Sequence, residues 1–200
     1  CLIELWDYGS SSLLISYAIN LKMNLYPYLN QIIPKVLKLD DPIKILSSLQ
    51  INCIIINAKE KVSFDIIKIL IDMVNEGKYE ALQALNDIIP SAHNLDKYIP
   101  LIIDACLKSI SDYIHCINNI DDDDEDEYYY EEEEDKYEKL KKLKFNNAVS
   151  VLQRLAAKSK VFDDTEIIFK KHFPKIQKVL ALFPKELNMI KNRSAELNNT

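Results

Sequence analysis

The amino-acid sequence predicts an all-α fold, a right-handed α-α superhelix in which pairs of helices stack on one another. Three observations predict it. The 200 residues include only two glycines, apolar residues recur at helical spacing, and one short proline-containing pattern appears three times. Sheet-rich folds and phosphate-binding loops need glycine at their turns, so its scarcity favours helices and argues against a nucleotide-binding domain. Apolar residues make up 48% of the chain, which is enough to bury a core.

Residues 1–25 are expected to form a truncated N-terminal repeat. Cys1 stands where a start methionine would be, and Leu2–Trp6 reads like the end of a helix. We therefore expect the chain to be a fragment of a longer protein. Trp6 should lie in the core of this first repeat, against Tyr17 and Leu21.

A repeated pattern begins next, in which a bulky apolar residue precedes a proline and apolar residues follow at helical spacing. Its copies are Leu29–Leu39, Asp96–Leu107 and Lys171–Leu180. Phe64–Val74 has the same pattern with Ile69 in place of the proline. Pro34, Ile69 and Pro100 lie 35 and then 31 residues apart. This period is typical of a two-helix repeat of the HEAT class.

Each of the first two patterned helices is followed by a second amphipathic stretch, one after the turn Asp40–Pro42 and one after Asn75–Gly77. We expect helix pairs near 26–57, 63–90, 96–158 and 165–197. These pairs give HEAT-like repeats over 26–119 and over 139–200. A closed helical bundle is the alternative. A proline in the same register three times favours the stack, because a helix pair buries its apolar face only against its neighbours.

An acidic insert, residues 120–138, interrupts the third pair. Its Asp121–Asp135 run contains twelve acids, three tyrosines and no basic residue. The acids are Asp121, Asp122, Asp123, Asp124, Glu125, Asp126, Glu127, Glu131, Glu132, Glu133, Glu134 and Asp135. The chain carries 25 basic and 31 acidic residues; without these twelve acids 19 remain, so the rest of the chain has a net charge of +6.

We predict that these acids form a partner-binding arm. Asp121–Glu127 should be disordered, because adjacent like charges repel and bury nothing. Tyr128–Lys144 should be partly helical, supported by i, i+4 pairs such as Glu138 with Lys142. The arm would either capture a basic partner by long-range attraction or fold back on the basic body. An inert solvated loop is the remaining alternative; Tyr128–Tyr130 favour contact because they add apolar area.

The layout resembles the karyopherin-β (importin-β) family of nuclear transport receptors. The segments that carry the likeness are Ala81–Pro90, Leu95–Leu107, the acidic run and Ala148–Ala156, and together they cover roughly residues 79–182. The last segment is similar to the helix that closes the acidic-loop repeat in the branch that imports ribosomal proteins and histones. The arginines common in this family's second helices are mostly absent, since Arg154 is one of only two arginines.

This resemblance implies basic cargo proteins as partners, the Ran GTPase as the factor that controls their release, and a location in cytoplasm and nucleus. Cargo would bind the second helices, around Pro42–Asn57, Lys78–Ile89 and Phe145–Lys158. The same layout is similar to the cullin-associated scaffold that exchanges substrate adaptors and, more weakly, to condensin-type HEAT subunits. The alternative function is therefore a regulatory assembly scaffold.

Residues for catalysis or metal binding do not occur at the spacing that these functions need. Ser10–Ser12 lie in no GxSxG turn, and His93, His115 and His172 form no HExxH motif. The cysteines have no CxxC spacing. We expect no enzymatic activity, cofactor, metal or small-molecule substrate. We also expect no membrane insertion, because the longest apolar run, Cys53–Ile56, is far shorter than the ~20 residues of a spanning helix.

A basic stretch, Lys136–Phe145, follows the acidic run and includes two aromatic residues. Such a composition occurs in nucleic-acid-binding segments. The adjacent acids would repel phosphate, so a continuing helix is the preferred interpretation and nucleic acid is not an expected partner. A localisation signal formed by Lys139, Lys141, Lys142 and Lys144 is a further alternative.

Overall fold

The computed structural model describes residues 11–39, 42–51, 65–90, 92, 95–119, 131–159 and 163–193. In these ranges every regular element is a helix, which confirms the all-α prediction. The elements are α1 (Ser11–Leu21), η2 (Lys22–Tyr28), α2 (Leu29–Val36), α3 (Ile43–Leu49), α4 (Ile66–Asn75), α5 (Glu80–Ile88), α6 (Ile99–Asn119), α7 (Glu131–Ser159), α8 (Asp163–Val179), η4 (Leu180–Leu182) and α9 (Pro184–Arg193).

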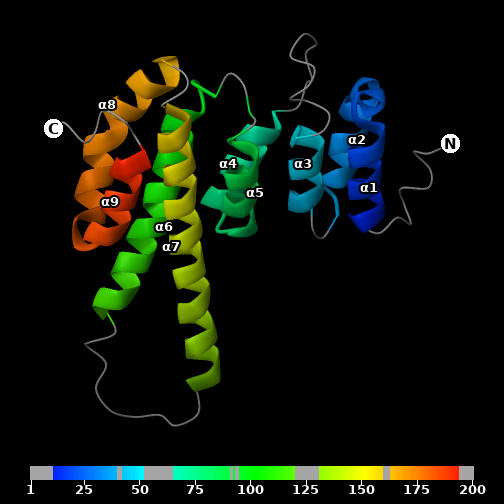
Figure 1. Ribbon diagram of the computed structural model, residues 1–200. Coiled ribbons are helices and arrows are strands. Elements are labelled where there is room, and N and C mark those ends of the chain that lie inside the picture. The colour runs from blue at the N-terminus through cyan, green and yellow to red at the C-terminus, as the bar shows by residue number, and fades with distance from the viewer. Residues whose placement is uncertain are drawn as a thin grey trace.

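The helices lie in two rows, and Figure 1 shows them following one another across the molecule from the N-terminal to the C-terminal end. In the first row α4 packs on α6 and α6 packs on α8. In the second row α1, α3, α5, α7 and α9 each pack on the next. Chain neighbours connect the rows, since α4 packs on α5 and α6 on α7. The apolar side chains between the rows are fully buried, among them Leu70, Leu85, Ile102 and Leu152.

Two sets of bonds hold α4 against α6, one at each end of α4. Asp65 caps α4 by accepting a hydrogen bond from the Lys68 backbone N–H at 3.2 Å, and the same carboxylate accepts one from the Tyr98 hydroxyl. At the other end, Lys108 Nζ donates to the Asn75 carbonyl at 3.1 Å. In each of the two inter-helix bonds the bonded residues are 33 positions apart in the sequence. Because this separation is the same at both ends of α4, α4 and α6 run parallel.

The second row has the same parallel arrangement. Ser150 Oγ on α7 donates to Asn86 Oδ1 on α5 at 3.0 Å, and Lys158 Nζ donates to the Pro90 carbonyl just after α5 at 3.3 Å. Lys158 is buried, with 9% of its surface exposed. Desolvation therefore lowers the pKa of its ammonium group, and the charge of Asp96 opposes that shift.

The turn between α4 and α5 ends α4 in a Schellman motif. The Gly77 N–H donates to the Val74 carbonyl at 2.9 Å and the Lys78 N–H donates to the Met73 carbonyl at 3.0 Å. Gly77 has a φ of +90°, a conformation that glycine adopts without a Cβ penalty. One of the two glycines of the sequence is therefore required by the turn between two paired helices.

Two expectations need correction. Pro100 is the second residue of α6, whereas Pro34 and Pro174 lie inside α2 and α8, so the prolines do not mark one position of a repeat. Pro174 is exposed and, as a proline, has no backbone N–H to donate within α8. Ile69 and Pro100, which are 31 residues apart, were treated as equivalent positions. This alignment is wrong by two residues, because α4 and α6 begin 33 residues apart, at 66 and 99.

α7 is one continuous helix of 29 residues that begins at Glu131 and includes the basic stretch. The continuing helix preferred for Lys136–Phe145 is therefore confirmed, and the arm that was expected to be partly helical over Tyr128–Lys144 is helical from Glu131 onward. Strong helix formers, mostly Glu, Lys and Leu, fill the first half of α7, so no residue there favours a break.

Candidate functional site

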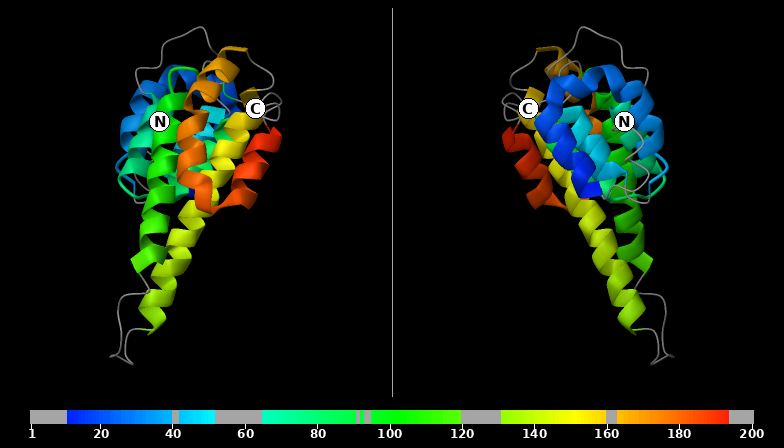
Figure 2. Two further views of the ribbon diagram at one scale, coloured as in Figure 1. Left: turned by 90° about the vertical axis from the view of Figure 1, so that its left-hand side faces the viewer. Right: turned by 90° about the vertical axis from the view of Figure 1, so that its right-hand side faces the viewer.

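The α6–α7 hairpin extends well beyond both rows, and in each view of Figure 2 it is the part that projects farthest. Both helices are longer than their counterparts, with 21 residues in α6 and 29 in α7. The predicted acidic insert connects their projecting ends, because α6 ends at Asn119 and α7 begins at Glu131. The hairpin therefore determines where the acidic run is attached to the rest of the protein.

Three aromatic rings form the base of this hairpin. The Phe145 ring on α7 lies 4.8 Å from the Tyr113 ring on α6 and 4.7 Å from the Phe183 ring at the start of α9, measured between centroids. Tyr113 and Phe183 are 6.3 Å apart. All three pairs are tilted, the arrangement that aromatic quadrupoles favour. This aromatic triad fixes α6, α7 and α9 to one another where the projecting part begins.

The predicted acidic site falls only partly within the described residues. Asp121, Asp122, Asp123, Asp124, Glu125, Asp126 and Glu127 lie outside them. Glu131, Glu132, Glu133, Glu134 and Asp135 belong to the first five residues of α7.

The basic stretch continues α7 from the acidic residues toward the triad. Lys139 and Lys142 are exposed, while Lys141 and Lys144 are half-buried. Lys144 reaches the α4–α5 turn, where its Nζ would be 3.9 Å from a Cβ placed on Gly77. At least this lysine therefore packs on the body of the protein.

The second helices were expected to form the cargo-facing surface. In the structure the exposed charged side chains that are described on these helices are mostly cationic. Among the side chains that the structure describes, which on α7 begin at Glu138, the exposed charged ones of α3, α5, α7 and α9 are Lys44, Asp87, Glu138, Lys139, Lys142, Arg154, Lys185 and Arg193. Six of these eight side chains are cationic and two are anionic. α3 offers almost no surface, since Lys44 is its one exposed side chain.

The groups that could perform chemistry are scattered. Among the described residues, no three His, Cys, Asp or Glu side chains are close enough to hold a metal ion. Cys106 is fully buried, and burial raises the pKa of its thiol far above the ordinary value. His115 is exposed on α6, and His93 lies outside the described residues. Of the helices that the structure describes, none is long and apolar enough to cross a membrane.

Sequence reasoning missed two features of this region. One is the aromatic triad; the other is a groove between α6 and the α8–η4 segment, lined by residues of both. Neither has a local signal, because each brings together side chains more than 30 residues apart in the sequence. The sequence shows that Tyr113, Phe145 and Phe183 are aromatic, but no pattern in it indicates that their rings meet.

No family model, curated protein or solved structure matches the chain. The resemblance to nuclear transport receptors therefore rests on the sequence features alone.

Proposed function

We propose that the chain is a segment of a HEAT-type solenoid that binds other proteins as a scaffold. The observation that supports this best is the parallel packing of successive first helices. Tyr98 bonds to Asp65 and Lys108 bonds to Asn75, each across 33 residues, so one unit is translated onto the next. Stacked two-helix repeats have this geometry, whereas neighbours in an up-down bundle run antiparallel.

The same proposal makes the α6–α7 hairpin the place where a basic partner is captured. The acidic run connects the projecting ends of α6 and α7, and five of its acids open α7. Six of the eight exposed charged side chains described on the second row have the opposite sign. A basic protein approaching the molecule is therefore attracted to the acidic end of the hairpin, and electrostatic attraction of this kind raises association rates.

A transport receptor of the karyopherin-β type is the function that we favour, with basic cargo bound through the acidic run, release controlled by Ran, and exchange between cytoplasm and nucleus. The layout of two-helix units with an acidic insert inside one unit supports it. A regulatory assembly scaffold would use the same hairpin without Ran.

Stopped-flow association with a fluorescent lysine-rich peptide tests the capture. In the test variant Asp121, Asp122 and Asp123 are changed to Asn. In the control Asp72 and Asp87 are changed to Asn and Glu76 to Gln, because these three exposed acids give the same change in net charge outside the hairpin.

At low ionic strength we expect the test variant to associate at least fivefold more slowly than the unchanged chain, and the control to change by less than twofold. High salt should remove the difference, because screening shortens the range of the attraction. Equal slowing in both variants would show that overall charge, and not the hairpin, attracts the peptide. A pull-down of the full-length protein with GTP-loaded Ran then separates the two functions: retention of Ran supports transport, and its absence with intact peptide capture supports the assembly scaffold.

A further inference from the structure

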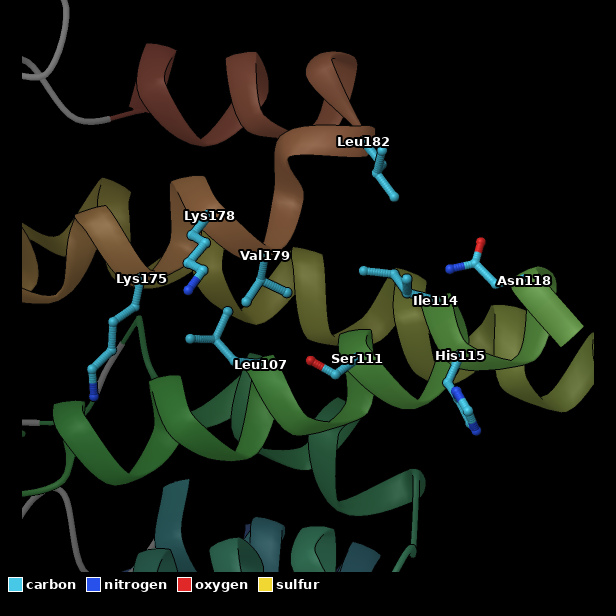
Figure 3. A pocket seen from close by; sticks show the side chains of 9 residues that line it. All are labelled: Leu107, Ser111, Ile114, His115, Asn118, Lys175, Lys178, Val179 and Leu182. Carbon is cyan, nitrogen blue, oxygen red and sulfur yellow. The ribbon is translucent and has the colours of Figure 1, made fainter.

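An open groove lies between α6 and the segment formed by α8 and η4 (Figure 3). Its volume is about 600 Å³, within the range of pockets that bind ligands. It is lined by Leu107, Ser111, Ile114, His115, Asn118, Lys175, Lys178, Val179 and Leu182. The groove is on the first row of helices, and the function proposed for the hairpin does not use it.

The floor of the groove is apolar, and it is formed from both sides. Figure 3 shows Val179 and Leu107 pointing toward each other, and Leu182 pointing from η4 toward Ile114. Leu182 keeps 66% of its surface exposed although it is a large aliphatic residue. No described helix covers this side chain, so its apolar surface is available to another molecule.

One wall of the groove is positively charged. Lys175 and Lys178 extend from consecutive turns of α8, and none of the nine lining residues is a carboxylate. Lys175 Nζ lies 3.4 Å from Asp104 Oδ1 in an exposed pair, which contributes little and exchanges easily with another partner. Lys178 makes no ion pair with a described residue. The combination of an apolar floor and a basic wall complements a ligand that is both apolar and acidic.

The dimensions indicate a peptide segment. The groove follows α6 from Leu107 to Asn118, and eleven steps of 1.5 Å give a length of about 16 Å. An extended chain covers this length with about five residues. In such a chain successive side chains point to opposite faces, so apolar residues at alternate positions can enter the groove. The acidic residues between them stay at its rim, where the long, flexible side chains of Lys175 and Lys178 can reach them.

We propose that the α6–α8 groove binds a short acidic segment of a partner protein that carries aliphatic or aromatic side chains. The groove shares α6 with the hairpin, but its ligand has the opposite charge to the partner proposed for the acidic run, so a test of one does not decide the other.

The probe is a fluorescently labelled seven-residue peptide of alternating glutamate and leucine, and binding is measured by fluorescence anisotropy at low ionic strength. We expect Lys175→Glu combined with Lys178→Glu to weaken binding at least tenfold. Leu182→Ser should weaken it at least threefold, and its folding effect is small because Leu182 is mostly exposed. Circular dichroism confirms that each variant is folded.

The matched control is Lys38→Glu combined with Lys142→Glu, which changes the net charge equally at two exposed positions away from the groove. It should change the affinity by less than twofold. A peptide with serine in place of leucine, and one with lysine in place of glutamate, should each bind at least tenfold more weakly. Equal losses in the groove variant and the control would overturn the proposal.

The chain's own acidic run is the competing occupant. In a variant with Asp121–Glu127 changed to Asn and Gln, the probe should bind with the same affinity at 300 mM salt, where long-range attraction is screened. Binding that becomes tenfold tighter in this variant would assign the groove to the acidic run and overturn the proposal of a partner protein.

Discussion

Replacing Phe145 by alanine should destabilise the protein more than any other single change in the α6–α7 hairpin. The Phe145 side chain is 5% exposed and contacts both other rings of the aromatic triad. Truncating a buried phenylalanine to alanine removes its apolar contacts and leaves a cavity, at a cost of about 3–5 kcal/mol. The hairpin would then lose its main connection to the start of α9.

A second variant, Phe145→Leu, separates ring contacts from apolar burial. Leucine keeps much of the apolar surface but forms no aromatic pair, and each pair contributes about 0.5–1.5 kcal/mol. Because Phe145 takes part in two pairs, we expect a loss of about 1–3 kcal/mol for leucine. Adding Phe183→Leu in a double-mutant cycle measures one of these pairs directly.

Urea unfolding followed by circular dichroism gives both values. With a slope of about 2–3 kcal/mol per molar urea, a loss of about 4 kcal/mol lowers the midpoint by roughly 1.3–2 M. Leu143→Ala is the control, since Leu143 lies two residues away on α7 with 42% of its surface exposed, and it should cost less than about 1 kcal/mol. Equal costs for Phe145→Ala and Leu143→Ala would refute the role of the triad.

Three further predictions follow from individual contacts. Tyr98→Phe removes the hydroxyl that donates to Asp65 and should cost about 1–2 kcal/mol in urea unfolding. Burial and this bond raise the Tyr98 pKa above 10, so the unchanged protein should lose stability relative to Tyr98→Phe as the pH rises above 10. Gly77→Ala should lower the unfolding free energy by about 1 kcal/mol or more, because alanine is strained at a φ of +90°. In native buffer iodoacetamide should modify Cys116 and leave buried Cys106 unreacted, as measured by peptide mass.

Each of these predictions has a distinct contradicting result. If the unfolding free energy of Tyr98→Phe fell with pH above 10 as much as that of the unchanged protein, burial and the bond to Asp65 would not favour the neutral form of Tyr98 in the folded state. Gly77→Asn is the control for Gly77→Ala and should cost less, because asparagine tolerates positive φ better than alanine. Alkylation at Cys106 as fast as at Cys116 would mean that the helix core opens readily.

The pattern of the sequence was sufficient to predict that the regular elements of the described residues are helices. Apolar residues at i, i+3, i+4 and i+7 mark one face of a helix whatever its partner is, and the turn at Gly77 needs a glycine for local reasons. The register of the repeat was not predictable in the same way. It is set by long-range bonds such as that from Tyr98 to Asp65, for which the proline positions are no guide.

The candidate surfaces illustrate the same limit. The acidic run could be found from composition alone, and the structure adds that Glu131 begins a helix that continues into the core. The α6–α8 groove could not be found, because Leu107 and Leu182 belong to separate apolar stripes that look alike in the sequence. The sequence pattern does not show which apolar residue is buried and which stays exposed, because this depends on the helices that pack beside it.

Because α7 is one continuous helix, a movement of its projecting end is transmitted to the part that packs on the rest of the protein. From Glu131 to Phe145 there are fourteen residues, so the helix start is about 21 Å from the ring that holds it. If α7 tilts about the position of Phe145 by about 10°, its first residue moves by about 4 Å. Load applied at the projecting end is therefore felt first as torque on Phe145 and its two neighbouring rings, and from there by α9.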